Sequence, residues 1–545
     1  MNNHNPFVTH RIENQPEPLT NYNAWQQDQA LQSAVQSLGG GWAADHLQAY
    51  GELVGGELMA LAVEANQNRP RFLPFDGYGR RIDRVEFHPA YHALMSKAMA
   101  FGLHSFAWQH PDKAGAHVAR AALLYLGYQA DSGICCPMSM TYAALPALKF
   151  NAVLAVSWGP KLTALQYDSR ELPMAAKVGC TVGMGMTEKQ GGSDVRTNTT
   201  RALKQANGSY TLLGHKWFFS APMSDAHLVL AQAEAGLSCF LVPRLLADGS
   251  RNRVAIQRLK DKLGDWSNAS SEVEFQEAVG LRVGEEGRGI ATILEMVALT
   301  RLDCLTCSAG LMRQALLQAV HHCRQRKVFG RLLIDQPIMA NVLADMALES
   351  EAAVLLAMRV AHAVDAAAHN PQEAALARIT TALGKYWVCK RTPMLVNEAL
   401  ECLGGIGYVE DTPMPRLYRQ APLNSIWEGA GNVQCLDVLR ALRREPLCGA
   451  VLFTEFDRVR GENRDLDQAV QQLKISLEGG TVEEAECRLL VEQIALALQA
   501  TLMLQYGERD LADAFCSARL GEARGRMFGA ARALPVRLLL QRVML

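Results

Sequence analysis

The spacing of apolar residues divides the sequence into stretches with different hydrophobic periodicity. Up to about residue 180 it is rich in alanine and leucine at helical spacing, as in AGAHVARAALLYLGYQA (114–130), and predicts mostly helices after an extended polar start. From about 181 to 283, short runs rich in aromatic and β-branched residues are separated by Gly, Pro, Asn and Asp. This pattern predicts strands of a compact β domain, at 209–220, 226–233, 237–243 and 270–279.

Long amphipathic stretches return after the β segment and cover 289–327, 338–369 and 375–405. Long helices with short connections predict an antiparallel bundle. A further helical block is expected beyond it, with a helix break at Gly479 and Gly480. The expected fold class is α+β, mostly α. The expected domains are 1–180, 181–283, 284–444 and 445–545.

Composition fits this division. A chain of 545 residues exceeds what one hydrophobic core usually serves, so two to four domains are expected. Hydrophobic content of 49% and charged content of 20% are ordinary for a soluble protein. The net charge of −1 argues against a globally cationic nucleic-acid coat but leaves room for a local basic patch. Neither a secretory signal nor the roughly 18–20 apolar residues of a membrane span is evident, so a cytoplasmic protein without a membrane partner is expected.

The thirteen cysteines are scattered without paired C-x-x-C spacing, which predicts buried thiols in a reducing compartment. His321, His322 and Cys323 are consecutive, but neighbours in a helix point in different directions. No metal site is therefore expected.

Two glycine-containing segments carry the candidate chemistry, GMGMTEKQGGSDV (183–195) and SIWEGAGN (425–432). Gly191 and Gly192 allow the backbone to approach a ligand closely, and backbone N–H groups in such a turn favour anionic oxygens. Taken alone, the first segment is a common β-turn, and Glu428 in the second is equally a cap or turn residue.

Together, in this order and spacing, the two segments resemble the acyl-CoA dehydrogenase flavoprotein family, and the resemblance covers about 130 to 444. It implies a helical N-terminal domain, a middle β-barrel and a C-terminal helical bundle, with FAD as cofactor and an acyl-CoA as substrate. Glu428 matches the base that removes a proton beside the thioester carbonyl. No G-x-G-x-x-G follows a strand, so FAD is not expected on a Rossmann unit.

The resemblance assigns cofactor contacts along the whole chain. Thr187 matches the threonine at the flavin ring, and Phe218 stands where the family usually has tryptophan. For Phe219 a strand-core role is an equal alternative. The segment 326–337 matches one that crosses to a neighbouring subunit's FAD. The implied FAD contacts are Met184, Gly185, Met186, Thr187, Ser193, Phe218, Phe219, Ser220, Arg326, Phe329, Gln336, Glu401, Gly404, Gly405 and Asn432.

The implied substrate contacts are Ser193, Arg301 and Trp427. One branch of the family carries its base on the long helix, but Thr300 and its neighbours there include no carboxylate, which leaves Glu428 as the candidate. Trp427 replaces the usual tyrosine and is expected to narrow the acyl pocket. Asn432 belongs to a stretch that lacks the family's usual hydroxyl residues. These departures predict weak turnover of a small or branched acyl group.

The motifs GHKWFFS, RLKDKLG and NSIWEG, with the extra C-terminal block, resemble a bacterial branch of this family that belongs to the adaptive response to DNA alkylation. That resemblance implies a homotetramer that binds double-stranded DNA through the block and has weak isovaleryl-CoA dehydrogenase-type activity. Residues 516–545 carry six arginines against one acid, on what is expected to be a basic helix. The implied DNA contacts are Arg519, Arg524, Arg526, Arg532 and Arg537.

Three alternatives remain open at the level of sequence: a DNA-binding flavoprotein, a catabolic short- or branched-chain acyl-CoA dehydrogenase, and a pseudoenzyme with structural FAD. The arginine-rich end favours the first over the second, although a basic helix is also common as a solvated or partner-docking face. The intact Glu428 weighs against the third.

Overall fold

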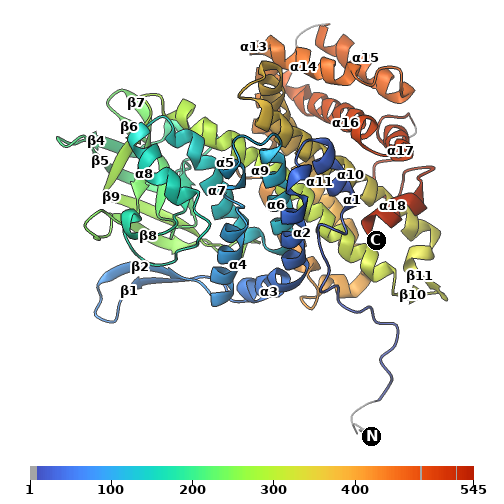
Figure 1. Ribbon diagram of the computed structural model, residues 1–545, viewed down its shortest axis with the longest axis horizontal. Helices are drawn as coiled ribbons and strands as arrows, with labels where there is room; N and C mark the ends of the chain where they lie inside the picture. The colour runs from blue at the N-terminus through green and yellow to red at the C-terminus, as the bar shows by residue number, and fades with distance from the viewer. Residues whose placement is uncertain (1–8, 479–481, 523–524, 545) are drawn as a thin grey trace.

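The computed structural model describes residues 9–478, 482–522 and 525–544. It consists of an N-terminal helical part, a β-barrel, a bundle of long helices and a C-terminal helical block, in that order along the chain (Figure 1). The predicted fold class is confirmed. Arg524 and the predicted helix break at Gly479 and Gly480 lie outside the described residues.

The N-terminal part is mainly helical but also contains an antiparallel hairpin, which the helical pattern of this region did not predict. The hairpin lies beside the barrel, where Arg81 donates a 2.7 Å hydrogen bond to the carbonyl of Ile256 (Figure 1). The elements are α1 (Gln29–Ser37), α2 (Ala44–Leu53), α3 (Met59–Gln67), β1 (Arg71–Phe75), β2 (Arg81–Glu86), α4 (Pro89–Ala100), α5 (Phe106–Gln109), α6 (Ala116–Ala130), α7 (Ser132–Leu148) and α8 (Ala152–Leu162).

The barrel is a seven-stranded sheet in the order β3-β6-β4-β5-β9-β7, with β8 paired to β9. A further pairing of β6 with β7 closes it, which satisfies the edge strands. Alternating apolar residues such as Leu228 and Leu230 of β6 are buried. The strands are β3 (Val182–Gly185), β4 (Arg201–Lys204), β5 (Tyr210–Ser220), β6 (Ala226–Ala233), β7 (Gly236–Pro243), β8 (Val254–Leu259) and β9 (Ser270–Val283).

The bundle is built on three long helices that follow the predicted stretches: α9 (Gly289–Cys323), α10 (Pro337–Ala366) and α11 (Pro371–Cys402). The start of α11 is fixed by Asn370, whose side chain accepts hydrogen bonds from the N–H groups of Gln372 and Glu373. The remaining elements are β10 (Lys327–Val328), β11 (Arg331–Leu332), η6 (Gly404–Tyr408), α12 (Met414–Gln420), η7 (Leu423–Ser425) and α13 (Gly431–Arg444).

The C-terminal block packs on the bundle but does not end in one continuous basic helix. The prediction of such a helix over 516–545 is wrong, because one helix ends at Arg519 and the next helix among the described residues begins at Val536. The block consists of α14 (Pro446–Asp457), α15 (Arg464–Glu478), α16 (Cys487–Tyr506), α17 (Arg509–Arg519) and α18 (Val536–Val543).

Among the described residues, one helical segment, Glu484–Tyr506, is long and apolar enough to cross a membrane, whereas the sequence was expected to contain none. However, 72% of its apolar window is buried inside the protein. Leu490, Val491 and Ile494 of α16 belong to the main apolar core. The segment therefore serves here as a core helix of the C-terminal block.

All thirteen cysteines are buried as free thiols, which confirms the prediction from their spacing. They are distributed over the N-terminal helical part, the barrel, the bundle and the C-terminal block. Burial raises the pKa of every one of them, as for Cys239 in the barrel, whose pKa is about 12.

Candidate functional site

The glycine-rich turn after β3 folds back on the middle of β5. The N–H of Trp217 donates a 2.8 Å hydrogen bond to the carbonyl of Thr187, and Asn198 donates one of 2.9 Å to the carbonyl of Met186. A Cβ on Gly192 would lie 2.3 Å from the Thr187 hydroxyl oxygen, so the turn requires glycine at that position. Ser193, next in the chain, is exposed on the outside of the turn.

Beneath the turn lies an ion pair that the sequence gave no reason to select. The Lys216 ammonium is 2.7 Å from a Glu188 carboxylate oxygen, and both side chains are fully removed from solvent. Glu188 also accepts hydrogen bonds from the N–H groups of Thr199 and Thr200. Burial alone would raise the pKa of Glu188, but Lys216 and these donors lower it to about 2.

The end of β5 presents alternate side chains to opposite sides of the barrel wall. Phe218 is 52% exposed on the outer face, whereas Phe219 is buried and stacks on His227 with ring centroids 3.8 Å apart. For the Phe219 side chain, the strand-core alternative is therefore the one the structure shows. The Ser220 hydroxyl is partly exposed and lies 3.3 Å from the hydroxyl of Ser270.

Glu428 lies in a tight turn between η7 and α13. Its φ is +59°, a left-handed conformation that a non-glycine residue adopts only when its surroundings impose it. Arg301 and Gln434 donate hydrogen bonds of 3.0 and 3.1 Å to the Glu428 carbonyl. Lys385 donates to the carbonyls of Asn424 and Gly429, at 3.0 and 2.8 Å, and so fixes both sides of the turn.

The Glu428 carboxylate faces α9. Thr300 of α9 donates a 2.8 Å hydrogen bond to its Oε2 atom. Burial raises the pKa of Glu428, although the Thr300 hydrogen bond and the charges of Lys385 and Arg301 oppose the shift. A carboxylate with a raised pKa is a better proton acceptor at neutral pH.

The two predicted substrate residues beside the base are both held in place. The Arg301 guanidinium lies 2.8 Å from Asp437, so it braces the turn as well as lining the site. Trp427 donates a 2.9 Å hydrogen bond to the Asn424 side chain. Trp427 and Met186 pack against one apolar cluster, which joins the barrel and bundle halves of the site and includes Cys136, Met140, Met184 and Leu299.

Asn432 is exposed at the start of α13, and its side-chain oxygen accepts a 2.9 Å hydrogen bond from Arg488 of α16. Gly185 is buried in β3, where an added Cβ would lie 2.7 Å from the ring of Phe219. Both residues are thus near the predicted site, one at its rim and one in its wall.

The remaining predicted cofactor residues lie far from Glu428. Thr300 contacts Glu428 near one end of α9, whereas Cys323 at the other end lies 3.8 Å from the carbonyl of Cys402, beside Glu401. At about 1.5 Å per residue, α9 rises about 35 Å between these two contacts. The β10–β11 turn lies at the opposite end of the molecule from the barrel (Figure 1). This distant group comprises Arg326, Phe329, Gln336, Glu401, Gly404 and Gly405.

Within that group, Phe329 is 96% exposed at a φ of +52° and Gly404 and Gly405 have open space around them. Gln336 donates a 2.9 Å hydrogen bond to the carbonyl of Val328, and Arg326 donates one to the carbonyl of Asn14. In a single copy of the chain, these residues do not share a site with Glu428.

The predicted DNA contacts divide into two groups. Arg519 is wrong as a surface contact: it is buried between Asp345 and Glu349 of α10, at 2.6 and 3.0 Å. The two carboxylates also have other partners, since Arg391 lies 2.8 Å from Glu349 and the N–H of Gly529 donates to Asp345. Arg519 completes the charge balance of this buried group. Arg526, Arg532 and Arg537 are exposed.

No group of three or more His, Cys, Asp or Glu side chains that could hold a metal ion occurs in the described ranges. The candidate site contains the Glu428 carboxyl, the hydroxyl groups of Thr187 and Ser220, and the exposed ring of Phe218.

Comparisons with known proteins agree with this architecture. Residues 183–278 match the family model described as "Acyl-CoA dehydrogenase, middle domain", and residues 287–443 match "Acyl-CoA dehydrogenase, C-terminal domain". A barrel joined to a helical bundle that presents a buried carboxyl base defines an FAD-dependent oxidoreductase of acyl-CoA dehydrogenase type, and the chain belongs to that family.

Within the family, residues 14–169 match the "Adaptive response protein AidB N-terminal domain". The chain is 47% identical to AidB of Escherichia coli strain K12, over 95% of this chain and 96% of that protein. Among solved structures, Caenorhabditis elegans ACDH-11 in complex with C11-CoA has a TM-score of 0.87 at 25% identity, covering 98% of this chain and 97% of that one. The apo-form of Bd2924 has a TM-score of 0.82 at 30% identity, covering 90% and 99%.

Proposed function

We propose that the chain oxidises a small or branched acyl-CoA with Glu428 as the catalytic base, and that it also binds double-stranded DNA and protects it during alkylation stress. The observation that carries the enzymatic part is the buried Glu428 carboxyl, held by Thr300 and braced by Arg301 and Lys385. Isovaleryl-CoA is the expected type of substrate, at low turnover.

The residues around Glu428 fit FAD. Phe218 offers an exposed aromatic face on the barrel wall. The Ser220 hydroxyl lies at the end of the same strand, and the Thr187 hydroxyl lies in the turn that follows β3. The turn offers open backbone at Gly191, because a Cβ there would meet nothing within 4 Å. When bound there, FAD supplies the hydride acceptor for the oxidation.

Glu428 accepts the proton from the carbon beside the thioester carbonyl. Its raised pKa favours protonation once the substrate proton is within reach, and Thr300 keeps the Oε2 atom in one orientation. Positioning of a general base contributes about 10²–10⁴-fold to such a reaction. Trp427 and Met140 limit the room for the acyl chain and exclude water from the base.

The test is the Glu428→Gln variant, which keeps the side-chain shape but removes the base. Anaerobic mixing of FAD-loaded protein with isovaleryl-CoA should bleach the flavin absorbance in the parent and leave it unchanged in the variant. Equal FAD content in both proteins is the control. Bleaching of the variant at the parental rate would show that another group removes the proton.

A tetrameric assembly is part of the proposal. The distance of about 35 Å along α9 separates Glu428 from the predicted contacts at Arg326 and Phe329, so a neighbouring copy is needed to bring both sets to one cofactor. Phe329, Ile338 and Tyr408 are 96%, 83% and 82% exposed, which is unusual for large apolar side chains and fits a surface covered by another subunit.

DNA binding is proposed through the C-terminal block, which follows the last matched family region at residue 443. Its support is the resemblance to AidB, described as an adaptive response protein, together with the exposed Arg526, Arg532 and Arg537. Guanidinium groups suit phosphate recognition because of their rigid fork of donors. Free thiols and a DNA partner fit a cytoplasmic location.

Under the alternative of a purely catabolic dehydrogenase, the protein would retain flavin bleaching but show no retardation of duplex DNA in a gel-shift assay at low salt.

A further inference from the structure

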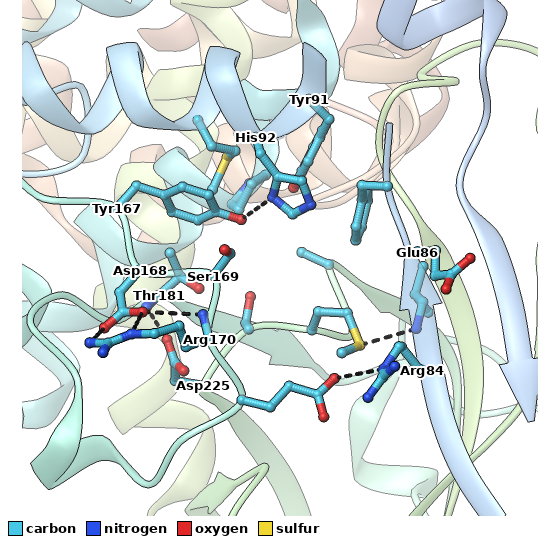
Figure 2. A pocket seen from close by; sticks show the side chains of 18 of the residues that line it. Arg84, Glu86, Tyr91, His92, Tyr167, Asp168, Ser169, Arg170, Thr181 and Asp225 are labelled. Atoms are coloured by element: carbon cyan, nitrogen blue, oxygen red, sulfur yellow. Dashed lines mark hydrogen bonds and ion pairs between the residues drawn. The ribbon is translucent and has the colours of Figure 1, made fainter. Parts of the chain in front are cut away.

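A cavity of about 950 Å³ lies between α4, the β1–β2 hairpin and one end of the barrel (Figure 2). This volume is within the range of about 300–1,000 Å³ typical of small-molecule sites. The cavity meets β3 at Thr181, whereas Thr187 of the flavin site follows the other end of that strand. In the described part of the chain, neither Glu428 nor Thr300 lines it.

One wall of the cavity is aromatic. Phe87 and Tyr91 stack with ring centroids 4.1 Å apart, and His92 and Tyr167 stack at 5.8 Å. His92 is also linked to the Tyr167 hydroxyl by a 2.9 Å hydrogen bond, as Figure 2 shows. Burial lowers the pKa of His92, so this wall is uncharged at neutral pH. Such a wall accommodates a flat ring by stacking.

The facing wall is rich in guanidinium groups. Two of them share one carboxylate: Arg84 lies 3.3 Å from Glu171, and Arg244 lies 3.9 Å from the same oxygen atom, beyond hydrogen-bonding distance. The Nε atom of Arg244 is buried and has no hydrogen-bond partner among the described residues. A buried donor without a partner costs free energy unless a water or ligand completes it.

The other charged groups of the lining are already paired. Arg170 binds Asp168 at 2.7 Å, and Lys177 binds Asp225 at 2.6 Å. Over the whole lining, six basic side chains face four carboxylates, with the histidines counted as neutral. The excess of positive charge is therefore available to a ligand mainly at Arg244.

We propose that this cavity is a second small-molecule site, which takes a compound that combines a flat aromatic ring with a carboxylate or phosphate group. The ring lies against the wall of Tyr91 and Tyr167, and the anion completes the donors of Arg244. Arg84 strengthens the site because it keeps Glu171 from neutralising Arg244. The site is independent of the oxidation at Glu428.

Isothermal titration of the full-length, FAD-loaded protein tests this with three probes. 3-Phenylpropionate carries a ring and a carboxylate, adenosine monophosphate carries a ring and a phosphate, and inorganic phosphate lacks the ring. At least one ring-bearing probe should bind about 10-fold more tightly than inorganic phosphate. Tighter binding of 3-phenylpropionate would indicate a site for a carboxylate, and tighter binding of adenosine monophosphate a site for a phosphate. The flavin spectrum should not change on binding.

Two variants locate the binding. Arg244→Gln should weaken the ring-bearing probe by about 10-fold or more, as expected for loss of a charge-assisted hydrogen bond of roughly 1.5–3 kcal/mol. Arg84→Gln should also weaken it, because Glu171 then becomes free to pair with Arg244. Arg84 is half-exposed, so its variant should fold even if the Arg244 variant does not. Arg253→Gln is the matched control and should bind as the parent does, because Arg253 is exposed just before β8 and is paired with Glu277.

Three results would overturn the proposal: no binding of either ring-bearing probe at about 10 mM, equal binding of inorganic phosphate, or unchanged binding in both cavity variants. The third would place the probe elsewhere on the protein.

Discussion

The Lys216 ammonium lies 2.7 Å from Glu188 inside the barrel, and neither side chain has any exposed surface. The glycine-rich turn of the flavin site is tied to this pair, because the N–H groups of Thr199 and Thr200 donate to the same carboxylate. The conformation of residues 188–200 therefore depends on a buried charge whose ion-pair partner among the described residues is Lys216.

Lys216→Met should destabilise the protein by about 3–5 kcal/mol, because it leaves the Glu188 carboxylate buried without its partner. Urea denaturation at neutral pH measures the loss, and weaker FAD retention should accompany it. The exposed Lys204 on β4 provides the control substitution Lys204→Met, for which about 0.5 kcal/mol or less is expected. A similar small loss for Lys216→Met would mean that the backbone donors alone hold Glu188.

The same pair predicts how stability depends on pH. The pKa of Glu188 in the folded protein is about 2, below its ordinary value of 4.5, so its stabilising contribution is complete above pH 4.5 and disappears as the pH falls towards 2. Glu188→Gln should remove this contribution. The difference in unfolding free energy between parent and variant should be largest near neutral pH and shrink steadily below pH 4.5. A pH-independent difference would contradict this assignment.

Thr300→Val removes the hydroxyl that donates to Glu428 and should raise the pKa of the base further. Since the base must be ionised to accept a proton, the rate of flavin bleaching rises with pH through this pKa. The acidic limb of the rate profile should therefore move to higher pH. Thr306→Val, in the same helix, is the control, because the Thr306 hydroxyl has no hydrogen-bond partner among the described residues. Coincident profiles for all three proteins would exclude a role for Thr300.

The exposed and buried arginines of the C-terminal block should behave differently. Replacing Arg526, Arg532 and Arg537 together with Gln should flatten the log–log salt dependence of duplex binding by up to about 2.7, at about 0.9 per phosphate contact. The effect should be similar for all duplex sequences, because phosphate contacts do not specify sequence. Filter binding across a range of salt concentrations measures the slope.

Arg519→Gln should leave that slope unchanged but lower the melting temperature, because Asp345 and Glu349 lose a buried partner. An unaltered slope in the triple variant would remove the arginines as DNA contacts.

Phe329→Asp should disrupt assembly without unfolding the chain, because the side chain is 96% exposed in a single copy. Light scattering should show smaller species, and FAD should dissociate more readily. Tyr78→Asp, at the similarly exposed tip of the β1–β2 hairpin, is the control and should leave the assembly intact. A tetramer with full FAD content in the Phe329 variant would place the subunit contact elsewhere.

Much of the fold follows from local pattern. The strands of the barrel are short runs rich in aromatic and β-branched residues with Gly, Pro, Asn or Asp between them, and the long helices have few breakers, so both were predictable. Glu428 could be predicted because the segment 425–432 that contains it occurs together with the glycine-rich segment 183–195 far upstream, in the order and spacing of the family. The side-chain directions of Phe218 and Phe219 follow from the two-residue period of a strand.

The rest depends on contacts between residues distant in sequence. Arginine spacing alone suggested a basic surface, but Arg519 is neutralised by Asp345 and Glu349, which lie more than 160 residues earlier on one face of α10. Likewise, Lys385 supports the Glu428 turn from a helix in which nothing marks it as special. Such pairings follow from packing between elements, which a single sequence does not display.

Because all thirteen cysteines are buried, the folded protein should react slowly with electrophiles in its surroundings. Electrophiles react with the thiolate form, and every thiol here is both enclosed and kept protonated by its raised pKa. The folded chain therefore offers methylating or oxidising agents almost none of the soft nucleophile that they normally consume first, and it can persist where proteins with exposed thiols are inactivated.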